Sequence, residues 1–388
     1  MAAETDKTPP KIDYEPLPEP VAQPVVSQTP QEPVPAAPDT TAKINYEFGK
    51  GLAVKSSDEN YLLRFQVRIK PRYQYIWTSG PNRVNVNTFN LSLMRTILSG
   101  NAINKDLRYF IQTEFYPTVN LKDAFIDYKI IDEFQVLFGQ TFIPFCRDLL
   151  GSSVKLQLVS NANTLTHFCP IRDIGIEIHG DVTKWLTYET FFVNGEGNNT
   201  PNFNKEMAMG LRLTGHLLGS KLPYQEGDLE NSKSPRLALG GGVLYDFGYG
   251  KETTTGFQNR LLKATADMAF AYRGIYLLGG TFLLNNLTLR KTDLGFLGQA
   301  GYFIWPKRLE LASRFSAIVP AKSGSALPMS GLTKGSSIPQ YETGFGLNYM
   351  VFGTHEFKVQ TDFTTLYNAN GIQNMNDHRF QFQVQVFF

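Results

Sequence analysis

The final stretch of the chain, HRFQFQVQVFF (378–388), places a large apolar side chain at every second position from Phe380 onward. The residues between them are Arg379 and a series of glutamines. A period of two is the repeat of a β-strand whose two faces lie in different environments. A flat apolar edge strand promotes aggregation in water, so its apolar face must meet either a protein core or lipid.

Composition bears on this choice. Of the 388 residues, 19% are charged, below the roughly 25% usual for soluble domains, and 13% are aromatic. No stretch approaches the roughly 18 consecutive apolar residues that a transmembrane helix needs. A transmembrane strand needs only about ten residues of alternating character. Composition therefore excludes helical spans and leaves a membrane barrel open.

Residues 1–43 differ from the rest of the chain. They hold ten of the 22 prolines and seven acidic residues against three lysines, a net charge of −4. Such a segment cannot bury enough apolar surface to fold, so we predict a disordered tail, either a flexible spacer or a peptide that docks onto a periplasmic partner. Residues 44–388 carry the remaining charge, +2 minus −4, or +6, and form the second predicted domain.

From residue 44 onward, seventeen strand-like runs alternate with connections of two kinds. Tight turns such as DE (132–133) gather at one end and long polar loops at the other, which is typical of an outer-membrane barrel. Only 220–234 is long but falls among the tight turns. An odd number of strands cannot close such a barrel, so 46–55 is a lead-in and sixteen antiparallel strands from 61 to 388 close around a water-filled lumen.

The run YLLRFQVRIKPRYQY (61–75) orients the faces. Its cations share one face, and each would cost about 2–4 kcal/mol at mid-depth in lipid, so that face must line the lumen. The other face meets outer-membrane lipid. In FNLSLMRTIL (89–98), however, Arg95 is in phase with the apolar residues, which requires either a bulge or an interface with a neighbouring subunit.

Two longer stretches, LKDAFIDYKIIDEFQVLFGQTFIPF (121–145) and CPIRDIGIEIHGD (169–181), resemble the phosphate-selective porins of the O and P type, and RLELASRFS (308–316) also fits. The resemblance covers about residues 45–388. It implies a sixteen-stranded barrel in the outer membrane of a Gram-negative bacterium, usually a homotrimer, that takes up small anions passively. It also implies that the third loop folds inward, that an arginine ladder guides anions, and that the terminal Phe388 is read by the barrel-insertion machinery.

The resemblance maps the constriction loop onto residues 143–172, with four charged side chains: Arg147, Asp148, Lys155 and Arg172. The predicted basic ladder that lines the channel consists of Arg64, Arg68, Lys70, Arg72, Arg108, Arg212, Arg314, Lys358 and Arg379. Donors spaced along a path suit a dehydrating anion. Acids intersperse the ladder, so the mixed lumen favours a mild anion preference over strict phosphate selectivity: Glu114, Asp123, Asp127, Glu177, Glu310, Glu342 and Asp362.

The two cysteines, Cys146 and Cys169, flank the mapped loop. A disulfide between them would fix the base of the loop; the alternative is two unrelated thiols.

No motif points to catalysis. The five histidines lack metal-ligand spacing, and neither a phosphate-binding loop nor a nucleophile elbow is present, so we predict no enzyme, no metal and no cofactor. The basic residues share no surface with interleaved aromatics, which argues against nucleic-acid binding. The sequence predicts a diffusion porin; the alternative is a structural outer-membrane protein whose periplasmic tail tethers a partner.

Overall fold

The computed structural model describes residues 42–80, 83, 85–249, 259–327 and 336–388. The predicted tail, residues 1–43, lies outside these residues except for its last two positions, and strand β1 (Lys43–Glu47) begins there. No helix among the described residues is both long and apolar enough to cross a membrane.

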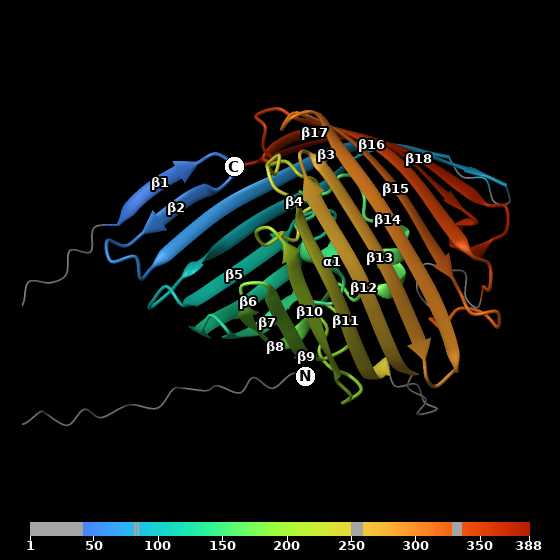
Figure 1. The fold of residues 1–388 in the computed structure, drawn as a ribbon, viewed down its shortest axis with the longest axis horizontal. Coiled ribbons are helices and arrows are strands. Elements are labelled where there is room, and N and C mark those ends of the chain that lie inside the picture. The colour runs from blue at the N-terminus through green and yellow to red at the C-terminus, as the bar shows by residue number, and fades with distance from the viewer. Residues whose placement is uncertain (1–41, 81–82, 84, 250–258, 328–335) are drawn as a thin grey trace, which may run out of the picture. The chain divides into compact units, whose positions relative to one another are not determined.

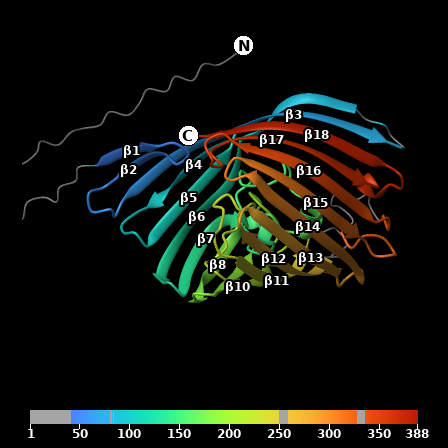
Figure 2. The same ribbon diagram turned by 45° about the horizontal axis from the view of Figure 1, so that its top comes forward.

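Sixteen antiparallel strands, β3 to β18, each pair with the next, and β18 pairs with β3 to close a barrel (Figures 1 and 2). The predicted sixteen-stranded barrel is therefore confirmed. Its strands are β3 (Leu62–Ser79), β4 (Asn85–Asn101), β5 (Leu107–Glu114), β6 (Asn120–Ile131), β7 (Phe134–Phe142), β8 (Arg172–Thr183), β9 (Leu186–Val193), β10 (Ala208–Leu218), β11 (Arg236–Tyr249), β12 (Asn259–Tyr272), β13 (Ile275–Asn286), β14 (Lys291–Trp305), β15 (Leu309–Val319), β16 (Gln340–Met350), β17 (Phe357–Tyr367) and β18 (Asn376–Phe387).

The predicted lead-in, 46–55, is a hairpin of β1 and β2 (Gly51–Lys55) rather than a single strand. Strand β2 pairs with the first residues of β3, from Leu62 to Phe65, while β18 pairs with β3 from Arg68 onward. The hairpin thus extends the sheet past the end of β18 without becoming a barrel strand.

The two ends of the barrel differ in their connections. One end, the short-turn end, carries turns such as 132–133, 184–185 and 273–274, together with the long connection 219–235. The other, the long-loop end, carries the connections 143–171, 194–207 and 320–339 and the short helix η1 (Ala369–Gly371).

The alternation read from the sequence sets the two faces of the wall. In β18, Phe380 and Phe382 are about 40% exposed on the outer face, whereas Gln381 and Gln383 are 1% exposed on the lumen side. An apolar band on the outside and polar groups inside are what lipid and water require.

The phase anomaly of Arg95 is caused by a bulge. The register between β3 and β4 shifts so that Lys70 faces Leu93 while the next residue, Pro71, faces Leu91, which leaves Ser92 as the extra residue. A bulge reverses the facing of all that follows, so Arg95 points into the lumen. The alternative, an interface with a neighbouring subunit, is not needed.

Candidate functional site

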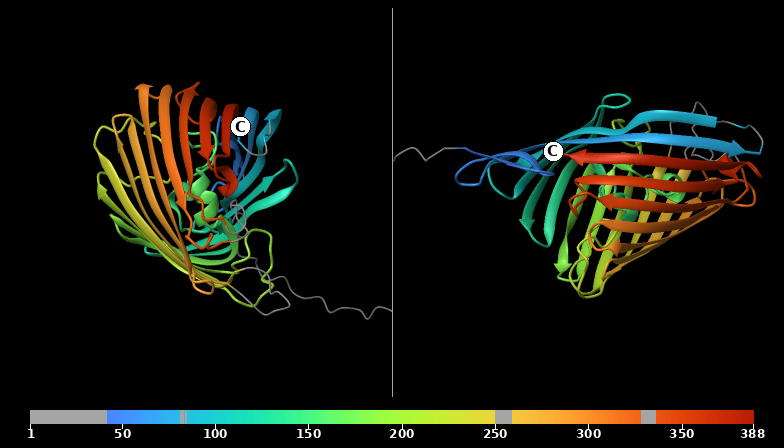
Figure 3. Two further views of the ribbon diagram at one scale, coloured as in Figure 1. Left: turned by 90° about the vertical axis from the view of Figure 1, so that its right-hand side faces the viewer. Right: turned by 90° about the horizontal axis from the view of Figure 1, so that it is seen from above.

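The third connection at the long-loop end, residues 143–171, folds into the barrel (Figure 3, left). It contains the short helices α1 (Arg147–Leu150) and α2 (Asn163–Phe168). Its Phe145, Leu165 and Phe168 are buried in one apolar cluster with lumen-facing side chains of β11 to β15: Leu244, Leu261, Phe282, Leu284, Leu297 and Ile318. At Gly295 an added Cβ would lie 2.4 Å from the ring of Phe168, so the glycine makes this approach possible. The predicted inward loop is confirmed, and it fills one side of the lumen.

A disulfide closes the base of this loop. Cys146 and Cys169 are bonded, with their Cα atoms 6.0 Å apart. The predicted disulfide is therefore confirmed, and the alternative of two unrelated thiols is wrong.

Five of the nine predicted ladder cations bond to the backbone of this loop. They donate to loop carbonyls across the lumen, and buried carbonyls must find such donors. The contacts are Lys70 Nζ to Ser153 O at 3.0 Å, Arg72 Nη2 to Val159 O at 3.3 Å, Arg212 Nη1 to Phe145 O at 2.8 Å, Arg314 Nη1 to Ser160 O at 2.9 Å, and Lys358 Nζ to Leu156 O at 2.8 Å.

Carboxylates of the wall complete the attachment by accepting from loop N–H groups. Asp362 accepts from Val159 N at 2.8 Å, and Glu342 accepts from Asn163 N at 2.7 Å. These acids were expected to weaken the selectivity of the ladder. In the structure they accept hydrogen bonds from loop amides and so help to hold the loop to the wall.

The connection 219–235 also enters the lumen, from the short-turn end, and meets the loop. Glu226 accepts from Gln157 N at 2.7 Å, and Glu226 N donates to Lys155 O at 3.2 Å. Tyr224 donates its hydroxyl to Glu189 at 2.9 Å. This connection is longer than the tight turns around it because it reaches into the lumen and contacts the loop from the short-turn end.

The remaining ladder residues lie elsewhere on the lumen wall. Arg68 donates to Ser152 Oγ at 3.2 Å, and Arg108 pairs with Asp127 at 2.7 Å near the short-turn end. The Nε atoms of Arg64 and Arg379 have no hydrogen-bond partner among the described residues. The role of all nine residues in permeation stays a prediction.

The four charged residues of the predicted constriction loop have different partners. Arg147 is buried and donates to Pro223 O at 3.0 Å, and Lys155 donates to Gln225 at 3.1 Å, so both face the connection 219–235. Arg172 instead forms a two-pronged pair with Asp123, at 2.9 and 3.1 Å.

Asp148 is the fourth, and it is unusual. Neither carboxylate oxygen has a hydrogen-bond partner among the described residues, although the side chain is only 6% exposed. Burial, followed by the nearby carboxylates of Glu226 and Asp267, raises the pKa of Asp148 to about 7.

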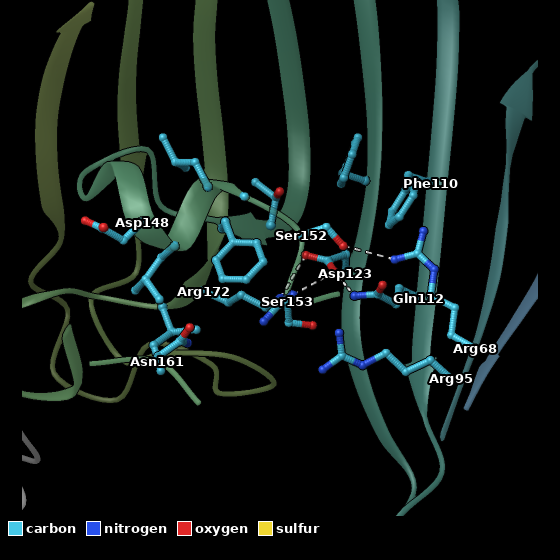
Figure 4. Close-up of a pocket in the computed structure, with 17 residues that line it drawn as sticks. Arg68, Arg95, Phe110, Gln112, Asp123, Asp148, Ser152, Ser153, Asn161 and Arg172 are labelled. Atoms are coloured by element: carbon cyan, nitrogen blue, oxygen red, sulfur yellow. Dashed lines mark hydrogen bonds and ion pairs between the residues drawn. The ribbon is translucent and has the colours of Figure 1, made fainter. Parts of the chain in front are cut away.

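A cavity of about 370 Å³ lies between the loop and lumen-facing side chains of β3 to β8, and we call it the arginine cavity (Figure 4). Its lining includes Arg68, Arg95 and Arg172 from the wall and Asp148 from α1. Arg68 and Arg95 are direct register partners on adjacent strands, so two like charges face the same space.

Sequence reasoning missed two features of this cavity. Arg95 was noticed only as an anomaly, yet a bulge was already one of its two explanations. The rings of Phe110 and Phe125 also line the cavity, and their phase with Gln112 and Asp123 in the sequence was the available signal. The meeting of the two lumenal segments had no local signal, because it joins residues about 70 positions apart.

Comparisons with known proteins agree with this architecture. The family model for phosphate-selective porin O and P matches residues 87–240, which include most of β4, all of β5 to β10 and the whole loop 143–171. A search of curated proteins found no match.

Solved structures share the barrel. An anion-selective porin from Comamonas acidovorans is 9% identical, with a TM-score of 0.58 over 84% of this chain and 99% of that one. The outer membrane channel DcaP of Acinetobacter baumannii is 10% identical, with a TM-score of 0.56 over 84% and 97%. OmpT of Vibrio cholerae, in its trimer form, is 10% identical, with a TM-score of 0.50 over 84% and 99%. Identity this low shows a shared fold, that of outer-membrane β-barrel channels, and the family model adds that residues 87–240 are similar to the phosphate-selective porins O and P.

Proposed function

We propose that this porin lets small hydrophilic solutes and ions diffuse passively through the arginine cavity, with a mild preference for anions. The observation that carries the proposal is the unequal use of charge among the lumenal cations. Five of them donate to loop carbonyls, whereas Arg68 and Arg95 line the cavity. Charged side chains that line a pore set its ion preference.

The charge count of the cavity supports a mild preference. Arg95 and Arg172 are paired with Glu114 and Asp123, while Arg68 makes no ion pair with any described residue. The three arginines and the two carboxylates paired with them sum to a net charge of about +1, with Asp148 not counted. Strict phosphate selection would need a denser set of donors, and Arg147 and Lys155 of the loop are turned away from this space.

Replacing both Arg68 and Arg95 by alanine should reduce the anion preference or reverse it, because the net positive charge of the cavity is removed. The measurement is the reversal potential of the purified channel in a planar bilayer under a potassium chloride gradient. Arg260→Ala is the matched control, since this exposed arginine lies at the start of β12, away from the cavity. An unchanged reversal potential in the double variant would remove both arginines from the permeation path.

Anion preference should also fall as the pH rises through about 7, the pKa of Asp148. Below that pH the carboxyl is neutral, and above it α1 carries a negative charge at the edge of the cavity, which opposes the excess of +1. Reversal potentials taken about one pH unit to either side should differ in the parent channel and coincide in Asp148→Asn. Burial also raises the pKa of Glu226, so Glu226→Gln is the comparison variant. The same pH response in Asp148→Asn would assign the titration to another group.

We further propose a homotrimer in outer-membrane lipid, with residues 1–43 in the periplasm and available to a periplasmic partner. The trimer form of Vibrio cholerae OmpT, which shares the fold, supports the first of these. The exposed ring of Phe388, whose backbone bonds to Val67, suits recognition by the barrel-insertion machinery. A purified protein that inserts into bilayers but passes no current would favour the alternative, a structural protein whose tail tethers a partner.

A further inference from the structure

Two phenylalanines occupy lumen-facing positions outside the apolar cluster around Phe168. Phe110 of β5 and Phe125 of β6 are register partners, and each shares its face with lumen-facing polar residues, Gln112 and Asp123. Their rings stack with centroids 5.5 Å apart and planes 17° apart. Both side chains are only partly buried and line the arginine cavity. Lumen-facing positions of a porin are normally polar, so this pair presents an apolar surface to the path of solutes.

Other apolar side chains belong to the lining of the same cavity. They are Phe142 of β7, Leu149 and Leu150 of α1, and Ile171 at the end of the loop. Each Å² of apolar surface left in water costs about 25 cal/mol, so a lining of this kind favours a solute that can cover it. A fully hydrated inorganic ion cannot cover it.

The cationic side of the same cavity is arranged to take an anionic group. Arg68 and Arg95 stand directly opposite each other on β3 and β4, and like charges in that position repel. Only one nitrogen of Arg95, its Nε, is paired with Glu114, and Arg68 uses Nε and Nη1 for Gln66 and Ser152. An anion between the two guanidinium groups would relieve their repulsion and accept from the remaining N–H groups.

The spacing between the two features fits one small molecule. Arg95 faces Glu114 across the strands, and Phe110 lies four positions before Glu114 on β5. At about 3.4 Å per residue, the Cα atoms of Phe110 and Glu114 are about 14 Å apart along β5. The long side chains of the arginines shorten the gap between their guanidinium groups and the ring of Phe110. A carboxylate joined to a ring by a short chain spans such a distance.

We propose that the arginine cavity is a subsite for organic anions that carry an apolar, ring-sized body, with the anionic group at Arg68 and Arg95 and the body against Phe110 and Phe125. This inference rests on the proposed channel function and specifies the solute class for the same cavity. Inorganic phosphate would use the arginines alone and gain nothing from the rings.

The test measures block of the chloride current through the full-length porin in a planar bilayer by three probes: 3-phenylpropanoate, propanoate and inorganic phosphate. 3-Phenylpropanoate should block at about tenfold lower concentration than propanoate, equal to about 1.4 kcal/mol from the ring contacts. Phe110→Ala combined with Phe125→Ala should abolish that difference while the chloride conductance persists. The matched control is Phe138→Ala, which removes a ring that is 63% exposed on the outer face.

The outcomes separate the two proposals. A channel that conducts chloride but is blocked equally by 3-phenylpropanoate and propanoate overturns the subsite and leaves the porin function intact. A protein that passes no current overturns both. If the double variant does not fold, the subsite is tested by comparing the three probes on the parent channel and on Phe110→Leu. Block by phosphate at a lower concentration than the other two probes overturns the inference.

Discussion

Replacing Arg212 by alanine should lower the free energy of unfolding of the barrel by about 3–5 kcal/mol, the cost of leaving a buried charge without its partner. Arg212 is 0% exposed, and its two terminal nitrogens bond to both oxygens of Asp267, at 2.7 and 2.8 Å. The same guanidinium donates to Phe145 O beside the disulfide of the loop. Urea unfolding of the protein in lipid vesicles, followed by tryptophan fluorescence, measures the change.

The geometry around Arg212 offers two comparison variants. Arg108→Ala removes an arginine whose side chain is 43% exposed and paired with Asp127, so the expected loss is about 1 kcal/mol or less. Gly240→Ala tests the space that the pair needs, because an added Cβ would lie 2.3 Å from Arg212 Nη2 and 2.7 Å from Asp267 Oδ1. If Arg212→Ala costs no more than Arg108→Ala, the buried pair does not hold the barrel together.

The barrel could be predicted from the sequence because its physical cause is local. A strand between lipid and water must alternate, and sixteen of the predicted runs coincide with β3 to β18 within a few residues. The same alternation placed Arg64, Arg68 and Arg212 on the lumen face. Where one residue is inserted, as at Ser92, the pattern fails locally, and the anomaly at Arg95 marks the place.

The use of each lumenal charge could not be predicted, because it depends on partners distant in the sequence. Lys358 and Leu156 are 202 positions apart, and nothing in either segment indicates that a lysine on β17 would donate to a loop carbonyl. Cations that line a path and cations that bond to a loop occupy the same alternate positions of a strand. Only the path of the loop separates them, and that path follows from the apolar cluster around Phe168.

The difference between the two sides of the lumen follows from the same apolar cluster. Strands β11 to β15 carry lumen-facing apolar residues at the long-loop end, which must be covered, and the loop covers them. Strands β3 to β8 instead line the arginine cavity. In the proposed function, the lumen is thereby divided into a side that the loop packs and a side that conducts.

Deleting most of the loop should therefore raise the conductance several-fold, because the packed side would open to water. The deletion replaces residues 148–167 with a three-residue Gly-Ser-Gly linker, and the disulfide is retained because the Cα atoms of Cys146 and Cys169 are only 6.0 Å apart. Anion preference should fall as well, since Arg68 and Arg95 would then line only part of a wider pore. Single-channel recording in a potassium chloride solution gives both quantities.

The deletion also exposes the wall residues that the loop covers, so its barrel should be less stable, and its fold is checked by the heat-dependent electrophoretic mobility of the protein. Thr166→Ala, an exposed position in α2 that lies outside the lining of the arginine cavity, is the control and should conduct like the parent. A folded deletion variant with the parent conductance would mean that another segment limits the flow. The connection 219–235, which meets the loop through Glu226 and Gln157, is the segment that the structure then implicates, because it enters the lumen independently from the other end.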